Sequence, residues 1–184
     1  MPRIAPVARA EASAEQRRIA DPIFAARGGE YGGPWGILLH DPELFRRAGA
    51  LGDYVRDGAS LPRRLSELVI ALTARHWTAQ FEWAAHYHQA LAAGLAAAVL
   101  EAIRTRTPPP FANDDERAVY DYVRALYANQ GIPDDVHRRA VAAVGERGVI
   151  GIVATAGFYS SIALVINAFE LPVRRADPPP PLPE

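Results

Sequence analysis

The segment most informative about the fold of this chain is residues 67–94, which read ELVIALTARHWTAQFEWAAHYHQALAAG. Apolar residues recur in it at the spacing of an α-helix, and three ionisable side chains, Glu67, Glu82 and His86, interrupt the apolar run. Glu82 and His86 are four residues apart, so they lie on the same face of one helix. A carboxylate beside an imidazole can shift the pKa of that imidazole. These three residues are therefore the candidate catalytic residues of the chain.

Helix signals extend in both directions from this segment. Asp41 followed by Pro42 is typical of a helix start, because it combines an N-cap acceptor with a proline at the first helical position. Thr78 is the expected N-cap of the second helix of the segment, and Gly94 its expected end. We expect helices over residues 14–26, 42–57, 62–74, 79–94, 95–104, 114–128, 134–145 and 146–171.

The chain as a whole is predicted to be all-α, with about seven to eight helices, because no strict period-two alternation persists over the length of a strand. A glycine-rich loop is expected over residues 28–36. The 184 residues fit a single domain, which we place at residues 1–176. The tail, residues 177–184, is mostly proline and is expected to be extended or disordered.

Charge and hydropathy argue against two classes of partner. The formal net charge is −1 and the charges are spread along the chain, so no nucleic-acid binding is predicted. Residues 1–13 contain no continuous apolar segment, so no signal peptide is predicted and the cytoplasm is the expected compartment. Polar residues interrupt the longest apolar stretch, residues 149–169. We therefore interpret that stretch as a buried helix rather than a membrane span and predict no membrane partner.

The composition removes a large part of enzyme chemistry. The chain contains no cysteine, and all 20 of its basic residues are arginine. Disulfides, thiolate nucleophiles and cysteine-based metal sites are therefore excluded. Schiff-base mechanisms that need a lysine amine are excluded as well.

Each candidate residue also has a structural interpretation. Glu67 could be a first-turn carboxylate that interacts with the helix dipole, and Glu82 could form an ion pair with Arg75 or another arginine. Glu82 and His86 could share a metal ion, but the sequence lacks an obvious third ligand nearby, so no metal site is predicted. His88 points about 200° away from His86 around the helix, so only one of the two histidines is expected to be functional.

Aromatic residues predict an apolar ligand pocket with a few polar groups. Asn167 lies in the most apolar helix, where an amide without a partner would cost about 1–3 kcal/mol, so we expect it to form a hydrogen bond to a neighbouring helix. The glycine-rich loop does not follow a predicted strand, so it is not expected to be a phosphate-binding loop. The aromatic residues are Tyr31, Trp35, Phe81, Trp83 and Tyr159.

The spacing of the central residues resembles a known family. Eleven residues separate Glu67 from Ala79, two further residues lead to Glu82, and three more lead to His86. This order is similar to the core two-helix unit of the carboxymuconolactone decarboxylase and alkylhydroperoxidase D-like family. Together with other similar segments, the resemblance covers most of residues 30–170. The other similar segments are GPWGILLHDP at residues 33–42, Gly157-Phe158-Tyr159 and Asn167-Ala168-Phe169.

The resemblance implies an all-helical bundle that assembles into a homo-oligomer, commonly a trimer or hexamer, with the site near a subunit contact. Family members with peroxidase activity carry Cys-x-x-Cys at the positions of Ala79 and Glu82, so a thiol peroxidase is excluded here. What carries over is Glu67 and His86 as the acid–base pair, with Glu82 in the place of the second cysteine.

The reaction implied by the resemblance is cofactor-independent decarboxylation of a small carboxylated lactone or related cyclic acid. His86 is the expected general acid and Glu67 its orienting partner, while Glu82 relays a second proton or holds a substrate hydroxyl. The roles of the two glutamates can be exchanged. Arg75 is the expected receptor of the substrate carboxylate. An isomerase or hydratase, or a family member that binds a small ligand without catalysis, is the alternative. The other expected substrate contacts are Trp35, His40, Trp83, Tyr159 and Asn167.

Overall fold

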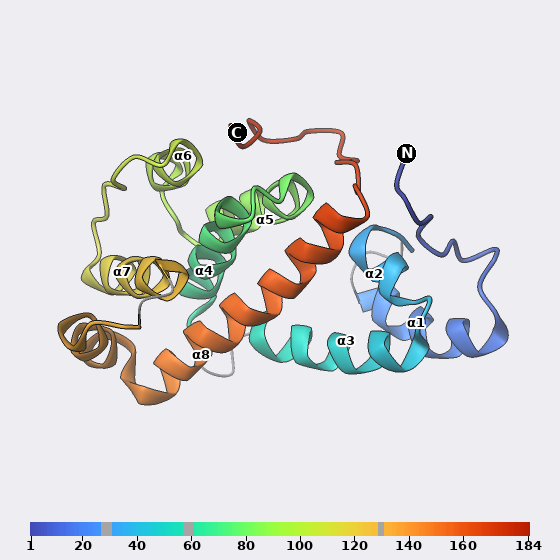
Figure 1. The fold of residues 1–184 in the computed structure, drawn as a ribbon, viewed down its shortest axis with the longest axis horizontal. Helices are drawn as coiled ribbons and strands as arrows, with labels where there is room; N and C mark the ends of the chain where they lie inside the picture. Colours follow the sequence, from blue (N-terminus) through green and yellow to red (C-terminus); the bar gives the residue numbers. More distant parts are fainter. Residues whose placement is uncertain (27–30, 57–60, 129–130) are drawn as a thin grey trace.

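The computed structural model of this chain describes residues 1–26, 31–56, 61–128 and 131–184. These residues form eight α-helices and no β-strand, so the all-α prediction is confirmed (Figure 1). The helices are α1 (Ala14–Ala26), α2 (Gly33–Leu38), α3 (Pro42–Arg56), α4 (Arg63–His76), α5 (Gln80–Ala92), α6 (Ala97–Thr105), α7 (Asp114–Ala128) and α8 (Asp134–Ala168).

Helix α8 is the central element of the fold. Figure 1 shows it crossing the molecule, with α4 to α7 on one side and α1 to α3 on the other. Ile152 in its middle belongs to a hydrophobic core shared with α4 and α7, and Ile162 belongs to a second core shared with α2 and α3. Among the described residues α8 is the one helix long and apolar enough to cross a membrane. Within the fold 56% of its most apolar window is buried, as expected for a core helix.

A break at Gly145 divides α8 into two parts. The sequence predicts that one helix ends near Gly145 and that the next begins at Glu146, and the backbone of Gly145 is non-helical, with φ 72° and ψ 167°. This combination of angles is essentially restricted to glycine, because a Cβ would clash with the backbone. The break lets residues 134–144 pack beside α7 while the rest of α8 crosses the molecule.

The turn between α4 and α5 differs from the prediction. Thr78 was expected to cap α5, but the N-cap position is Ala79, and Thr78 adopts a left-handed backbone conformation with φ 49°. Its hydroxyl instead accepts a hydrogen bond from Arg75 Nη1 at 3.0 Å. The Ala79 amide closes the turn by donating to the Ala74 carbonyl at 2.8 Å. The chain reverses over few residues as a result, and α4 and α5 pack against each other.

Helix α2 replaces much of the expected glycine-rich loop. Residues 33–38 are helical, with Pro34 in the first turn, whereas residues 28–30 lie outside the described residues. Gly36 allows a close approach, because a Cβ at this position would lie 2.6 Å from Cβ of Pro6. The Val7 amide donates to the Gly36 carbonyl at 3.0 Å. The N-terminal segment is thereby held against α2.

The C-terminal tail, residues 177–184, forms no helix or strand and is held against the protein. The side-chain amide of Gln80 donates to the Leu182 carbonyl at 2.7 Å and accepts from the Leu182 amide at 3.0 Å. Trp83 Nε1 donates to the Pro180 carbonyl at 3.0 Å. Leu182 is buried in the core beside α4 and α5. These contacts anchor the tail along α5.

Replacing Gly145 by alanine should lower the free energy of unfolding by about 1–3 kcal/mol, because the backbone angles at this position suit only glycine. Crowding against the rest of the fold does not contribute, since no atom beyond the neighbouring backbone lies within 4 Å of the position that the new Cβ would occupy. Urea denaturation of the purified variant measures the change.

Gly157→Ala is the matched control. Gly157 is exposed and helical in the same helix, and a Cβ there would also meet nothing within 4 Å. Because alanine is a better helix former than glycine, this substitution should stabilise by about 0.5–1 kcal/mol. Equal changes in the free energy of unfolding for Gly145→Ala and Gly157→Ala would contradict the inference that the backbone at the break requires glycine.

Candidate active site

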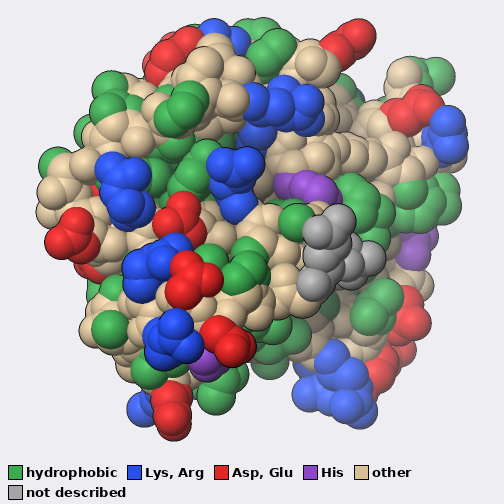
Figure 2. Space-filling model, turned by 60° about the vertical axis from the view of Figure 1, so that its left-hand side comes forward, with side chains coloured by type: hydrophobic (Ala, Val, Ile, Leu, Met, Phe, Trp, Pro, Cys, Tyr) green, Lys and Arg blue, Asp and Glu red, His purple; other side chains and the backbone are tan. Residues whose placement is uncertain are grey.

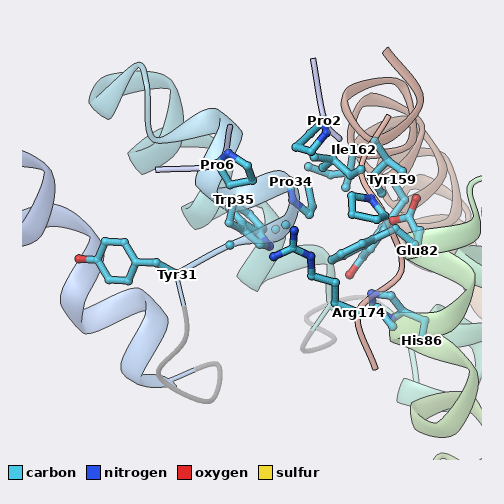
Figure 3. Close-up of a pocket in the computed structure, with 18 of the residues that line it drawn as sticks. Pro2, Pro6, Tyr31, Pro34, Trp35, Glu82, His86, Tyr159, Ile162 and Arg174 are labelled. Atoms are coloured by element: carbon cyan, nitrogen blue, oxygen red, sulfur yellow. The ribbon is translucent and has the colours of Figure 1, made fainter. Parts of the chain in front are cut away.

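A cavity of about 540 Å³ lies between α2, α3, α5 and α8, and the N-terminal segment and residues 171–174 cover it (Figure 3). This volume falls in the range of small-molecule sites. Its walls are mainly apolar and aromatic, and its few ionisable groups come from α3, α5, α8, the segment after α8 and Tyr31 before α2. The aromatic lining residues are Phe24, Tyr31, Trp35, Phe81, Phe158 and Tyr159.

His86 lines the cavity and is tied to α4 by Glu67. His86 Nδ1 lies 2.9 Å from Glu67 Oε2, and Arg63 Nη2 lies 2.7 Å from Glu67 Oε1 as an ion pair. The Glu67 side chain is 0% exposed and that of His86 is 13% exposed. An ionised carboxylate only accepts hydrogen bonds, so beside Glu67 the Nδ1 atom carries the hydrogen. Nε2 is then the ring nitrogen left to exchange a proton with a ligand.

Glu82 lies on the same face of α5 as His86. Unlike Glu67, it has no charged or hydrogen-bonding partner among the described residues. It is 2% exposed, and neither carboxyl oxygen has a hydrogen-bond partner among the described residues. Burial raises the pKa of the Glu82 carboxyl well above its ordinary value of 4.5.

The position of Glu82 in the first turn of α5 opposes this rise in its pKa, because the positive end of a helix dipole favours the ionised carboxylate. That effect is worth about 0.3–1 kcal/mol at exposed positions, less than the several kcal/mol needed to bury an unpaired charge. Desolvation therefore dominates. Glu82 stays a neutral acid over a pH range in which an ordinary glutamate is ionised.

Tyr159 forms the wall next to the imidazole. Its ring meets that of His86 edge-on, with 5.1 Å between the centroids and an interplanar angle of 89°. Burial, with the neighbouring carboxylates, raises the pKa of Tyr159 far above its ordinary value, so its hydroxyl keeps its proton. Tyr159 can therefore donate a hydrogen bond but does not serve as a base.

Two arginines supply positive charge to the cavity. Arg56, at the end of α3, and Arg174, in the segment after α8, both line it. Figure 3 shows the Arg174 side chain extending between His86 and Trp35 in this view. A guanidinium presents paired N–H donors that match a carboxylate, so a cavity lined by these two arginines suits an anionic group.

The structure brings some of the residues predicted from sequence to the cavity. Glu82, His86, Trp35 and Tyr159 line it, and Glu67 lies behind His86. The suggested ion pair between Glu82 and Arg75 is absent among the described residues, because the Glu82 oxygens have no partner.

The other predicted contacts lie elsewhere. His40 Nε2 is 2.9 Å from the Ala5 carbonyl, and Asn167 Nδ2 donates to the Trp77 carbonyl at 2.8 Å. Trp83 is buried in the core and bonded to the tail. Arg75 lines a different cavity, between α4, α6 and α7. None of these four side chains reaches the cavity beside His86.

Three charged residues near the site were not predicted. Arg63 precedes Glu67 by four residues on α4, a spacing from which their ion pair could have been inferred. Arg56 and Arg174 carry no local signal, because only the tertiary fold brings them together. Within the described ranges no group of three or more His, Asp and Glu side chains is placed to hold a metal ion.

Proteins of known structure resemble this chain in fold, but the comparisons of its sequence found no match. No protein-family model matches the chain, and no curated protein matches it. A protein of unknown function from Agrobacterium tumefaciens, suggested to be the antioxidant defence protein AhpD, aligns with a TM-score of 0.66 at 21% sequence identity. The alignment covers 74% of this chain and 94% of that one.

Two structures of the debrominase Bmp8 align over more of the chain. A Cys→Ala variant in complex with 2,3,4-tribromopyrrole has a TM-score of 0.77 at 15% identity, covering 95% of this chain and 92% of that one. The ligand-free form has a TM-score of 0.74 at 14% identity, covering 94% and 92%. These likenesses show that the chain has an AhpD-like helical fold.

The stability of the protein should report the buried neutral state of Glu82. Its folded pKa is raised, so the stabilisation is complete below about pH 4.5 and is lost as the pH rises toward the folded value. Glu82→Gln removes this dependence. The unfolding free energy of the variant minus that of the wild type should therefore increase with pH above 4.5, by up to about 1.4 kcal/mol per pH unit.

Urea denaturation at pH 5 and pH 7 measures this difference, and Glu101→Gln is the control. Arg104 lowers the pKa of the exposed Glu101 carboxyl, so its contribution to stability changes only below about pH 4.5, and the difference for Glu101→Gln should be the same at pH 5 and pH 7. A pH-independent difference for Glu82→Gln would show that Glu82 is ionised in the folded protein.

Proposed function

We propose that this chain is a cofactor-independent acid–base enzyme of the carboxymuconolactone decarboxylase and alkylhydroperoxidase D-like family. Its proposed reaction is the decarboxylation of a small carboxylated lactone or related cyclic acid. The observation that carries the proposal is one histidine between two glutamates of opposite character at an aromatic cavity. Glu67 contacts His86 and Arg63, whereas the carboxyl of Glu82 is buried without a partner. Pairs of carboxyl groups with divergent environments are how proteins separate acid and base roles.

The cavity supports a cyclic, anionic substrate. Aromatic side chains, among them Trp35 and Phe81, provide flat apolar walls, and Arg56 and Arg174 provide positive charge for a carboxylate. The debrominase that shares the fold was crystallised with 2,3,4-tribromopyrrole, a small ring compound. A ring of that size is well within the 540 Å³ available here.

The proposed reaction breaks the bond between a ring carbon and its carboxylate. Carbon dioxide leaves, and the electron pair moves into the neighbouring carbonyl. Neutral Glu82 donates a hydrogen bond to that carbonyl oxygen as negative charge develops on it. The His86 imidazolium then protonates the ring carbon through Nε2, with Glu67 holding Nδ1, and His86 regains its proton from water. One proton is consumed for each carbon dioxide released.

Reductive debromination does not fit this chain. Replacing a ring bromine by hydrogen adds two electrons to the ring, so it needs an electron donor. A thiol is one such donor, and the chain has no cysteine, whereas the Bmp8 structure with bound tribromopyrrole carries a Cys→Ala substitution. Proton transfer by His86 and Glu82 needs no such donor.

Purified protein should release carbon dioxide from at least one member of a panel of carboxylated lactones and cyclic keto acids, and the corresponding methyl esters should be inert. His86→Ala should lower turnover by about 100-fold or more, because a positioned general acid contributes at least that much. Gas release and the mass of the product are the measurements.

His88→Ala is the matched control, because His88 lies on the same helix but does not line the cavity and contacts the Asp177 carbonyl instead. It should retain turnover. An unchanged product mass would replace the proposal by an isomerase, and a gain of one water by a hydratase. Thermal stabilisation by a panel member without turnover would replace it by a binding protein.

Assembly into a homo-oligomer is part of the proposal. Large apolar side chains are exposed on α3 and α8, which pack together, and such a surface is typical of a subunit contact. Ile150→Lys should therefore reduce the mass measured by light scattering, while Val173→Lys, at an exposed position outside these helices, should leave it unchanged. A wild-type mass equal to one chain would contradict assembly. The exposed residues are Leu44, Leu51, Tyr54, Ile150, Val153 and Leu164.

A further inference from the structure

A second cavity, of about 430 Å³, lies on the other side of α4, bounded by α6, α7 and the segment after α6. It shares no lining residue with the cavity beside His86. Three arginines line it, Arg75 from α4, Arg106 from the end of α6 and Arg124 from α7. No carboxylate is among its lining residues.

Arg75 is a buried cation without a counter-charge. It is 5% exposed, and its only hydrogen bond among the described residues runs from Nη1 to the Thr78 hydroxyl at 3.0 Å. Its Nε atom has no partner. The pKa of an arginine is too high for the side chain to lose its proton, so Arg75 keeps its positive charge. A bound anion is the remaining group that can compensate this charge.

The surroundings of Arg75 add to the positive charge. Burial and the neighbouring Arg106 and Arg104 lower the pKa of the Arg75 guanidinium, which means that the cations repel one another. Arg104 is neutralised by Glu101 at 2.7 Å, whereas Arg106 and Arg124 form no ion pair with any described residue. On the face shown in Figure 2 several arginines lie beside acidic side chains, whereas no carboxylate lines the second cavity.

The remaining walls are apolar and aromatic. The Arg124 guanidinium lies over the Tyr120 ring, 5.6 Å from its centroid, and His76 stacks on Tyr127 with 4.0 Å between centroids. A ligand here meets both positive charge and apolar surface. Such a lining favours an organic anion over an inorganic one. The other apolar lining residues include Leu72, Ile103 and Val123.

We propose that this second cavity is a binding site for a small organic anion, with Arg75 as the buried counter-charge of its carboxylate or phosphate group. Arg106 and Arg124 hold the same group from the solvent side, and the aromatic rings contact the body of the ligand. This site does not depend on the reaction proposed for the cavity beside His86, because no residue serves both.

The test is titration of the full chain with benzoate and with phenyl phosphate, followed by calorimetry and by thermal melting in a buffer free of other multivalent anions. Both probes should raise the melting temperature of the His86→Ala variant in a saturable manner. In that background Arg75→Met should weaken binding by about tenfold or more, because a charge-assisted hydrogen bond is lost. Arg106→Asn should also weaken binding, since asparagine tolerates the left-handed backbone found at residue 106, where φ is 59°.

Arg147→Ala is the control for loss of one positive charge, because Arg147 is exposed in α8 and outside the cavity. It should bind both probes as the parent does. Equal binding by the parent and by Arg75→Met overturns the proposal, as does no binding at all. If Arg75→Met fails to fold, unchanged affinity in Arg106→Asn overturns it.

Light scattering separates a free ligand from a carboxylate of a second copy of the chain. An unchanged mass for Arg75→Met, together with its loss of probe binding, supports the free anion. Dissociation of an assembly by Arg75→Met, without probe binding by the parent, assigns the site to a subunit contact and overturns the proposal.

Discussion

The contact between Glu67 on α4 and His86 on α5 is the constraint on which the site depends. A carboxylate that is fully removed from solvent needs partners, and here these are the imidazole at 2.9 Å and the Arg63 guanidinium at 2.7 Å. The contact fixes how far α5 can slide along α4, and the closed turn at Ala79 fixes the direction of the return. With α5 so placed, its His86 and Glu82 face the cavity that α8 completes.

The two glutamates differ because of their neighbours rather than their own chemistry. Glu67 precedes the apolar part of α4 and follows Arg63 by one helical turn, so the Arg63 guanidinium pairs with its carboxylate. Glu82 begins α5 between Phe81 and Trp83, and its carboxyl meets no cation among the described residues. Sequence alone left the roles of the two glutamates interchangeable. The environments favour Glu67 as the charged partner of the imidazole and Glu82 as the neutral acid.

The features that the sequence predicted well are set by residues close to one another in the chain. Asp41 and Pro42 mark the start of α3, where the Asp41 carboxylate accepts from the Leu44 amide, and Gly145 marks the break in α8 because other residues rarely adopt that backbone conformation. What it missed depends on three-dimensional placement. Arg75 is the arginine nearest in sequence to Glu82 and His86, yet it lies at the end of α4, before the turn to α5, and lines another cavity. The docking of the proline-rich tail rests on Gln80, whose side chain carries no local signal for a partner so distant in the sequence.

The composition then narrows which groups can exchange protons at the cavity. With no lysine and no cysteine in the chain, its cations other than histidine are arginines, which keep their charge. Arg56 and Arg174 can therefore bind an anion in the cavity but cannot give a proton to it. Burial raises the pKa of Tyr159 far enough to remove it as a base, and burial together with a hydrogen bond to Asp21 raises the pKa of Tyr31 to about 12, which removes it as well. Among the described lining residues this leaves His86 and Glu82, and the two lie one helical turn apart on the same face of α5. Any proton transfer in this cavity that uses a side chain must therefore pass through that pair.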